Sequence, residues 1–329
     1  MDYKRKYYKY KTKYRSLINT LNGGGTYNKI TDVNFSFIDL SQNDYISADL
    51  YDFFNKLKGI TRVQQLDLSS NKLSDLVNMR DAIRYNRSIK ILDLSNNAIS
   101  DISPLSIGLE QNNILEQIVL NNNKISDINP LVNIKNIKIL LLDDNLINNI
   151  DQFSLMLKTN EIIQKISLSY NKIDQNNLNL LADALVFNKS LRILNLNGNQ
   201  ISDISSISNM LKHNKTLAEL DLSDNFIVNV DSLKDALIKN NSLQTLNLSQ
   251  NRISDITALS AGIMKNTNMQ KLYLGNNNIA YYLPLIEALD KNKKMQVYNI
   301  GNTLFNDIET QIDLNNLVLY NRIDYADDF

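Results

Sequence analysis

The side chains that most often perform chemistry in proteins are scarce in this sequence. It has one histidine, His213, and no cysteine, so it cannot form a Cys–His nucleophile pair or the cysteine and histidine sets that hold zinc. The run Gly23–Gly25 lacks the Lys-Ser/Thr of a phosphate-binding loop. Aspartates are numerous but recur at fixed positions, as helix-capping residues do. We therefore predict no catalytic residue, no metal site, no cofactor, no small-molecule substrate and no enzymatic activity.

A different kind of residue recurs throughout the chain. From residue 35 to residue 303 the sequence repeats hydrophobic–x–x–hydrophobic–x–Leu–x–x–Asn, and a clear copy contains Val63, Leu66 and Leu68 before its asparagine. Successive copies lie 22 to 28 residues apart, most often 26. This periodicity is typical of a solenoid whose units pack on their neighbours, and it predicts about eleven units. The last position of the pattern is filled by Asn43, Asn71, Asn97, Asn123, Asn145, Asn171, Asn199, Asn225, Asn251, Asn277 and finally Thr303.

The residue types within one unit predict its local structure. Leu66 and Leu68 are two residues apart, so on a strand they point to the same side and we expect both in the core. A buried asparagine is costly unless its amide is paired. Because that amide has both donors and an acceptor, we expect Asn71 and its equivalents to bond backbone groups at the turn and to bridge neighbouring units.

The rest of each unit predicts a short helix. Ser74 and Asp75 are favoured N-cap residues and precede apolar residues at helical spacing. Residues 128–134 contain Pro130 in the shortest unit, and there we expect a 3₁₀ turn or an extended segment. A second column of asparagines is predicted to end the helices as left-handed C-caps. That column consists of Asn86, Asn112, Asn160, Asn188, Asn214, Asn240, Asn266 and Asn292.

This unit resembles the leucine-rich repeat, from residue 35 to residue 303. The resemblance implies an α/β fold, a curved leucine-rich-repeat solenoid with a parallel sheet on its concave face and short helices on its convex face. The sequence of residues 99–105 is similar to that of internalin-type repeats. The sequence of residues 188–191, where two units join, is similar to that of ribonuclease-inhibitor-type repeats. The function implied is a non-enzymatic scaffold for protein–protein interaction, with a protein partner whose identity the sequence does not give.

Binding by such a scaffold depends on the outward residues of the strands, which the fold does not dictate. Two columns are predicted to face outward, and the last unit contributes Val297 and Asn299 to them. The first column contains Phe37, Gln65, Ile91, Gln117, Ile139, Lys165, Ile193, Glu219, Thr245 and Lys271. The second contains Asp39, Asp67, Asp93, Val119, Leu141, Ser167, Asn195, Asp221, Asn247 and Tyr273.

Two features stand out in these columns. The aspartates of the first three units form an acidic strip, and apolar residues of units three to five form a patch. Exposed apolar clusters mark partner sites more often than scattered residues do, so we predict that the patch binds the partner. The competing interpretation is that β-branched residues simply suit strands. The predicted partner-binding residues are Ile91, Val119, Ile139 and Leu141, with Tyr170 nearby in the turns that follow the strands.

Residues 1–25 form a separate predicted segment. The segment contains seven basic residues and one aspartate, which gives a local charge of +6, and Gly23–Gly25 is predicted to end it as a hinge. The apolar residues follow a heptad spacing on a predicted helix. A helix of this kind suits an anionic membrane surface, a nucleic acid or self-association, and a solvated tail is the fourth interpretation. Its apolar positions are Tyr3, Tyr7, Tyr10, Tyr14, Leu17 and Leu21.

The same segment is similar to the N-terminal segment of many otherwise unrelated proteins of mimivirus-like giant DNA viruses. The similarity covers Tyr-Lys-x-Lys-Tyr-x-x-Leu and the glycine run, within residues 3–25. It implies a viral protein that works in the host cell cytoplasm or in the virion. The alternative function is therefore a tethered or self-assembling structural protein that acts through the basic segment.

The remaining features concern the domains and the compartment. Three parts are predicted: the tail 1–25, the repeat array 26–303 and a C-terminal cap 304–329 with an acidic outer face. The formal net charge is zero, so no overall field draws the chain to nucleic acid. No 18-residue apolar stretch predicts a transmembrane segment, and the N-terminus lacks the apolar core of a signal peptide. We therefore predict a cytoplasmic location.

Overall fold

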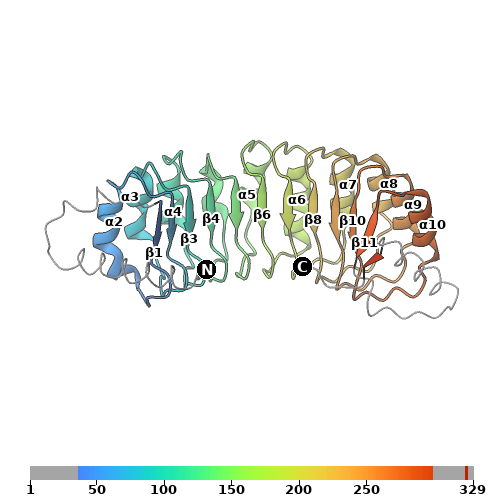
Figure 1. Ribbon diagram of the computed structural model, residues 1–329, viewed down its shortest axis with the longest axis horizontal. Helices are drawn as coiled ribbons and strands as arrows, with labels where there is room; N and C mark the ends of the chain where they lie inside the picture. The colour runs from blue at the N-terminus through green and yellow to red at the C-terminus, as the bar shows by residue number, and fades with distance from the viewer. Residues whose placement is uncertain (1–35, 299–322, 325–329) are drawn as a thin grey trace, which may run out of the picture. The chain divides into compact units, whose positions relative to one another are not determined.

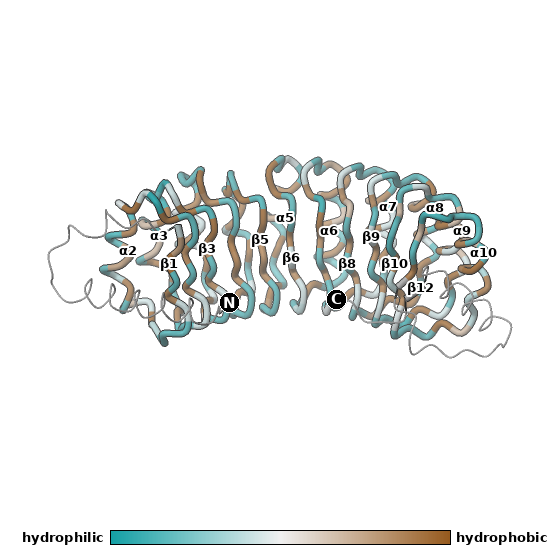
Figure 2. Tube along the Cα trace, in the orientation of Figure 1, coloured by the Kyte–Doolittle hydropathy of each residue, from teal (hydrophilic) through white to brown (hydrophobic). Residues whose placement is uncertain are grey.

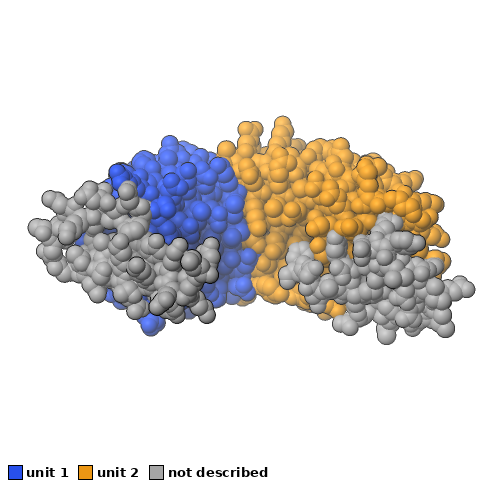
Figure 3. Space-filling view, in the orientation of Figure 1, with its two compact units in different colours: residues 1–146 blue, residues 147–329 orange. Residues whose placement is uncertain are grey.

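The computed structural model describes residues 36–298 and 323–324. The chain divides into two compact units, residues 1–146 and 147–329 (Figure 3). The predicted boundaries near residues 25 and 303 lie outside the described residues, so the division into tail, array and cap stays a prediction.

Unit 1 alternates short strands with short helical segments. Its five strands pair in parallel with their neighbours, each residue opposite its equivalent in the next repeat. The strands are β1 (Phe37–Asp39), β2 (Gln65–Asp67), β3 (Ile91–Asp93), β4 (Gln117–Val119) and β5 (Ile139–Leu141). The segments between them are η1 (Ser47–Leu50), α2 (Tyr51–Leu57), α3 (Val77–Tyr85), α4 (Ser103–Leu109) and η2 (Asn129–Asn133).

Unit 2 is built in the same way, and in Figure 1 its strands lie beside strands and its helices beside helices. Its strands also pair in parallel in chain order. They are β6 (Lys165–Ser167), β7 (Ile193–Asn195), β8 (Glu219–Asp221), β9 (Thr245–Asn247), β10 (Lys271–Tyr273), β11 (Gln296–Tyr298) and β12 (Ile323–Asp324). Its helices are α5 (Asp151–Leu157), α6 (Gln175–Leu185), α7 (Ser205–His213), α8 (Leu233–Lys239), α9 (Thr257–Lys265) and α10 (Leu283–Lys291).

The core of each unit consists of the repeated leucines and isoleucines. Leu66 and Leu68 are fully buried, as predicted, and so are Leu194 and Leu196 at the same positions of unit 2. Successive residues on a strand point to opposite sides, so the residue between each pair faces outward. Figure 2 shows the result along the chain: hydrophobic segments recur in the strands of both units, and hydrophilic segments recur in the turns.

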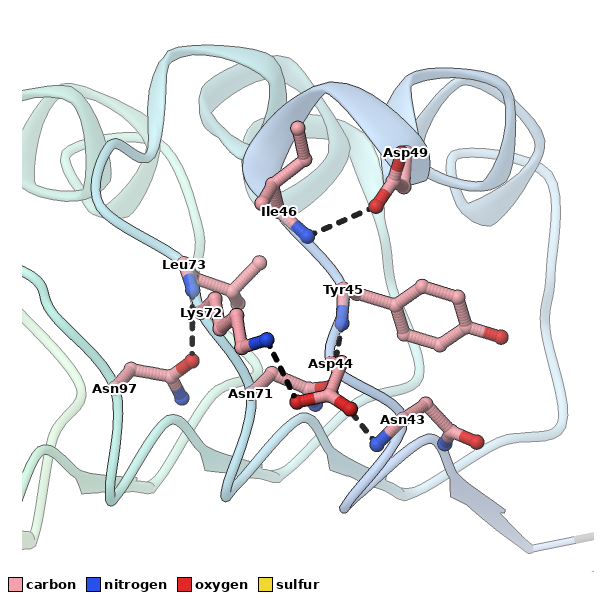
Figure 4. A network of polar contacts seen from close by, with 9 residues as sticks. All are labelled: Asn43, Asp44, Tyr45, Ile46, Asp49, Asn71, Lys72, Leu73 and Asn97. Carbon is pink, nitrogen blue, oxygen red and sulfur yellow. Dashed lines mark hydrogen bonds and ion pairs between the residues drawn. The ribbon is translucent and has the colours of Figure 1, made fainter.

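The first asparagine column forms the predicted ladder between repeats (Figure 4). Asn71 Oδ1 accepts from the backbone N–H of Asn43 and of Tyr45, both at 3.1 Å. Its Nδ2 donates to the carbonyl of Leu40 in the preceding repeat at 2.9 Å and to that of Leu68 in its own repeat at 3.0 Å. Each asparagine therefore satisfies backbone groups of two repeats at once, which confirms the prediction.

The second asparagine column does not adopt the left-handed conformation that we predicted. Asn86 follows α3 with φ −66° and ψ 135°, an extended conformation. Its Nδ2 donates to the carbonyl of Leu57 at 2.8 Å, and its Oδ1 accepts from the N–H groups of Ser88 and Ile89, both at 2.9 Å. The prediction was wrong about the backbone because the asparagine's role lies in its side chain, which builds a second ladder on the helical side.

The left-handed residues lie elsewhere: all except Asp44 stand directly before an asparagine of the first column. This position has φ of 54° at Ser70 and 66° at Gly198, and it turns the chain out of the strand. Most of the residues there are small or polar, types that tolerate this region better than bulky ones. The other members of the column are Gln42, Asn96, Asn122, Asp144, Tyr170, Asp224, Gln250 and Asn276.

Helix starts differ from the prediction by one or two residues. Asp255 and Asp203 are not the N-cap residues; each lies just before the cap, and its Oδ1 accepts from the backbone N–H two residues on, at 2.8 Å and 2.9 Å. Only α6 among the described helices has a side-chain N-cap bond, from Asn177 N to Asp174 Oδ1 at 2.9 Å. The segment with Pro130 is the 3₁₀ helix η2, as predicted.

The strand register of the last described repeat corrects a second prediction. Val297 was expected to face outward, but it pairs with Leu272 and is fully buried. Tyr298 pairs with Tyr273, while Asn299, which we had aligned there, lies outside the described residues. The step from β10 to β11 is 25 residues instead of 26, and a one-residue slip moves every side chain of a strand to the other face.

Candidate partner-binding face

Four of the five predicted binding residues lie on the outward face of the sheet in unit 1. Ile91, Val119, Ile139 and Leu141 are all partly exposed, and the residue between each outward pair is fully buried. These side chains face outward because the fully buried residue at the centre of each strand (Leu92, Ile118 or Leu140) fixes the strand's orientation. The structure therefore places the predicted patch on an accessible surface.

The pairing of the strands shows which of these side chains are direct neighbours. Val119 on β4 lies opposite Leu141 on β5, and Ile139 is two residues from Leu141 on the same face. Gln117 pairs with both Ile91 and Ile139 and so separates them in their row. Directly opposite residues are about 5 Å apart. Val119, Ile139 and Leu141 consequently form the continuous centre of the patch, and Ile91 lies at its margin.

Tyr170, the fifth predicted residue, lies in a turn of unit 2. It occupies the left-handed position before Asn171, with φ 50° and about half of its side chain exposed. Its ring covers Gly198 of the next repeat, where an added Cβ would be 2.5 Å from Tyr170 Cδ1. Tyr170 therefore packs on the next repeat of unit 2, and its role in partner binding stays a prediction.

The acidic strip lies beside the patch on the same sheet face. Asp39, Asp67 and Asp93 are in direct register on β1, β2 and β3, and Asp93 pairs with Val119. Burial raises the pKa of Asp67, and the neighbouring Asp93 and Asp39 raise it further, while hydrogen bonds from Ser69 act in the opposite direction. Like charges on adjacent strands repel.

Each of these carboxylates also shapes the turn that follows its strand. Asp39 Oδ1 accepts from Ser41 N and Oγ at 2.9 and 2.7 Å, and Asp93 Oδ1 accepts from Ser95 in the same way. In unit 2 the same role falls to a neutral residue, Asn247, whose Oδ1 accepts from Ser249 N at 3.0 Å. The turn therefore needs an acceptor oxygen and not a negative charge.

Among the residues of unit 2 that the structure describes, the equivalent face has no matching apolar patch. Its outward column contains Ser167, Asn247 and Tyr273, all of them buried, and Lys165 fills the position of Ile139 in β6. Ile193 is the partly exposed isoleucine there, between strands whose outward residues are Lys165 and Glu219. The contiguous apolar surface is thus a feature of the sheet in unit 1.

One exposed apolar pair was missed by the sequence analysis. Phe226 and Val228 lie in a turn of unit 2 and are about half exposed, and the guanidinium of Arg252 stacks 4.6 Å from the centre of the Phe226 ring. The same turn positions hold Lys72 and Ser74 in another repeat. The sequence could have revealed this pair, because two apolar residues stand there at positions where most other repeats carry polar ones.

The described residues contain no cluster of metal-binding side chains. Within 36–298 and 323–324, no group of three or more histidine, cysteine, aspartate or glutamate side chains could hold a metal ion. His213 is exposed at the end of α7, and its Nδ1 donates to the carbonyl of Asn209 at 2.9 Å. No helix in this part of the chain is long and apolar enough to span a membrane.

Comparison with known proteins identifies the repeat. The family described as Leucine Rich repeats (2 copies) matches residues 241–286, and the family described as Leucine Rich repeat matches residues 85–102 and 187–204. The chain contains leucine-rich repeats at these residues, and its fold is that of a leucine-rich-repeat solenoid. The predicted leucine-rich-repeat solenoid of about eleven repeats is therefore confirmed, with strands β1–β11 in the described residues. The likeness of residues 3–25 to giant-virus proteins lies outside the described residues and stays a prediction.

Two solved structures show the same fold. An internalin from Listeria monocytogenes is 17% identical with a TM-score of 0.58, over 96% of this chain and 94% of that chain. A leucine-rich-repeat protein of Leptospira interrogans is 20% identical with a TM-score of 0.58, over 86% of this chain and 69% of that chain. No curated protein matches the sequence. At these identities the likeness concerns the fold alone.

Proposed function

We propose that this leucine-rich-repeat protein is a non-enzymatic scaffold that binds a protein partner on the sheet face of unit 1. The observation that carries the proposal is the direct neighbourhood of Val119, Ile139 and Leu141, all partly exposed on β4 and β5. Ile91 extends this surface, and the contact of Tyr170, which lies in unit 2, stays a prediction. The core is complete without these side chains, so the fold itself does not require apolar residues at these outward positions.

The expected energy of such a contact is moderate. Fully covering a partly exposed valine, leucine or isoleucine contributes about 1 kcal/mol. Three of them together contribute about 3 kcal/mol, which corresponds to roughly a hundredfold in the dissociation constant. The patch is thus large enough to decide whether a partner binds at micromolar concentrations.

The test exchanges outward residues between strands of the same chain. Ile139→Lys with Leu141→Ser gives β5 the outward residues that β6 carries at Lys165 and Ser167, so the repeat fold tolerates them. We expect the variant to lose its affinity for a partner captured by the wild type and then purified by roughly thirtyfold, since two of the three residues, about 2 kcal/mol, are removed. Calorimetric titration of the purified partner measures this.

The matched control makes the same substitutions in unit 2, as Ile193→Lys with Asn195→Ser. It should leave the affinity within about twofold of the wild type. Equal loss in both variants would show that the effect does not come from the patch, and unchanged affinity in the β5 variant would reject the placement of the site.

A cytoplasmic location, or a virion if the protein is viral, is part of the proposal, and the asparagine ladder supports it. Asn188 and Asn214 each begin an Asn-x-Ser/Thr triplet, the acceptor sequence for N-glycosylation. Both are buried, and their amide nitrogens donate to the carbonyls of Leu157 and Leu185 at 2.7 Å. A glycan on either nitrogen would abolish the ladder at that repeat. Synthesis into a glycosylating compartment should therefore impair folding. Replacing the serine or threonine of every Asn-x-Ser/Thr triplet with Ala should restore it, at Ser36, Ser88, Ser190, Thr216, Ser242 and Ser249.

A further inference from the structure

The sheet face of unit 1 lacks a positive charge to balance its acidic strip. Strands β1–β5 contain no lysine or arginine, whereas β6 and β10 carry Lys165 and Lys271. The strip is continuous with the apolar patch, because Asp93 pairs with Val119. An occupant that fits this face must combine positive charges with apolar side chains along a single element.

The chain itself contains a segment with this combination. Residues 3–21 have seven basic residues and no acidic one, interleaved with tyrosines and leucines at heptad spacing. The C-terminal portion from residue 306 carries the opposite charge, −5, from six acidic residues and one arginine. Charge complementarity with the strip thus selects the N-terminal segment.

The segment is joined to the chain close to the acidic strip. The first described strand, β1, begins at Phe37 and carries Asp39. Residues 22–35 can span up to ~46 Å at ~3.3 Å per residue. The face from β1 to β5 is four strand spacings wide, about 19 Å. The connection is therefore long enough for residues 3–21 to reach every part of the face.

We propose that residues 3–21 occupy the sheet face of unit 1 in the free protein, with basic side chains over Asp39, Asp67 and Asp93 and apolar side chains over Val119, Ile139 and Leu141. This inference rests on the proposed function, because a partner for the same face must displace the segment. The contact is intramolecular, and a connection of this length gives an effective concentration on the order of millimolar. A contact with a dissociation constant of ~0.1 mM would then be about nine-tenths formed.

Occupation of the face by the segment would lower the partner's apparent affinity in proportion to the fraction of molecules whose face is open. With one molecule in ten open, the reduction is about tenfold. The basic segment would thereby set the threshold concentration at which the scaffold engages its partner.

Trypsin tests the contact in the full-length protein, because it cleaves after lysine and arginine and residues 3–21 offer seven such sites. The test variant combines Asp39→Asn, Asp67→Asn and Asp93→Asn. Asparagine serves natively at the same turn position in Asn195 and Asn247, so the turns keep their acceptor. Circular dichroism verifies that the variant is folded.

We expect cleavage within residues 3–21 to be about tenfold faster in this variant than in the wild type, since the ion pairs of the two partly exposed carboxylates, Asp67 and Asp93, are lost. Leu141→Ser should also accelerate it. The control, Asp221→Asn with Asp224→Asn and Asp235→Asn, removes the same charge from unit 2 and should leave the rate unchanged.

Two outcomes would overturn the inference. Equal cleavage rates in wild type and the acidic-strip variant would show that the segment does not dock on this face. Protection that grows with protein concentration would show that the segment binds a second copy, whereas an intramolecular contact is independent of concentration. Either result leaves the partner titration with the β5 variant unaffected, so the failure of this inference is distinguishable from the failure of the proposed function.

Discussion

Gly198 and Tyr170 provide a sharp test of how neighbouring repeats pack. Gly198 occupies the left-handed position with φ 66°, and a Cβ there would lie 2.5 Å from Tyr170 Cδ1. Gly198→Ala therefore introduces two costs. The left-handed backbone costs a non-glycine residue roughly 1 kcal/mol, and displacing a packed ring costs roughly 1–3 kcal/mol. We expect the free energy of unfolding to fall by about 3 kcal/mol.

The second cost depends on the tyrosine, which makes a double-mutant cycle decisive. Ser70 fills the position of Tyr170 in unit 1 with φ 54°, so Tyr170→Ser keeps a residue that the repeat accepts. In the Tyr170→Ser background, Gly198→Ala should cost only about 1 kcal/mol. The coupling energy of about 2 kcal/mol is the part caused by the ring.

Urea denaturation followed by circular dichroism measures all four members of the cycle. The slope of the free energy against urea should stay the same, which shows that the substitutions change stability and not the extent of unfolding. A coupling energy near zero would refute the reasoning, because it would mean that the ring does not limit the space at Gly198.

Three further predictions concern the ladder, the helix starts and the strand register. Asn225→Ala leaves the N–H of Ile201 and the carbonyl of Leu196 without their amide partner and should lower the free energy of unfolding by about 3 kcal/mol in urea denaturation; a loss below about 0.5 kcal/mol would contradict the ladder's role. The pKa of Asp255 is lowered by hydrogen bonds from Thr257. The stabilisation that this carboxylate gives the folded state is therefore complete at pH values above its ordinary pKa of 3.8, and it is lost as the pH falls through the lowered pKa. Asp255→Ala should therefore cost about 1 kcal/mol at neutral pH and progressively less in acid, and a cost that is constant from pH 7 to pH 2 would exclude the carboxylate as its source. Val297→Asp places a charge in the core and should cost at least ~3 kcal/mol, whereas a neutral result in thermal denaturation would restore the outward register.

The candidate face was predictable in part. Alternation along a strand sufficed to identify Ile139 and Leu141 as outward, because Leu140 between them belongs to the repeated core. Their contact with Val119 required the pairing register, which the repeat period also implied. The packing of the Tyr170 ring was not predictable, because it depends on Gly198 in the next repeat.

The sequence by itself determined the repeat, the buried leucines and the ladder of Asn71 and its equivalents, because each follows from side-chain chemistry at a fixed period. A buried amide must find backbone partners wherever the turn lies. Tertiary structure decided the backbone conformation of each column. Asn86 and Ser70 both occupy constrained positions, yet only the packing of one repeat on the next makes the first extended and the second left-handed. The same packing set the register of Val297, since a strand's facing is fixed by the neighbour to which it hydrogen-bonds.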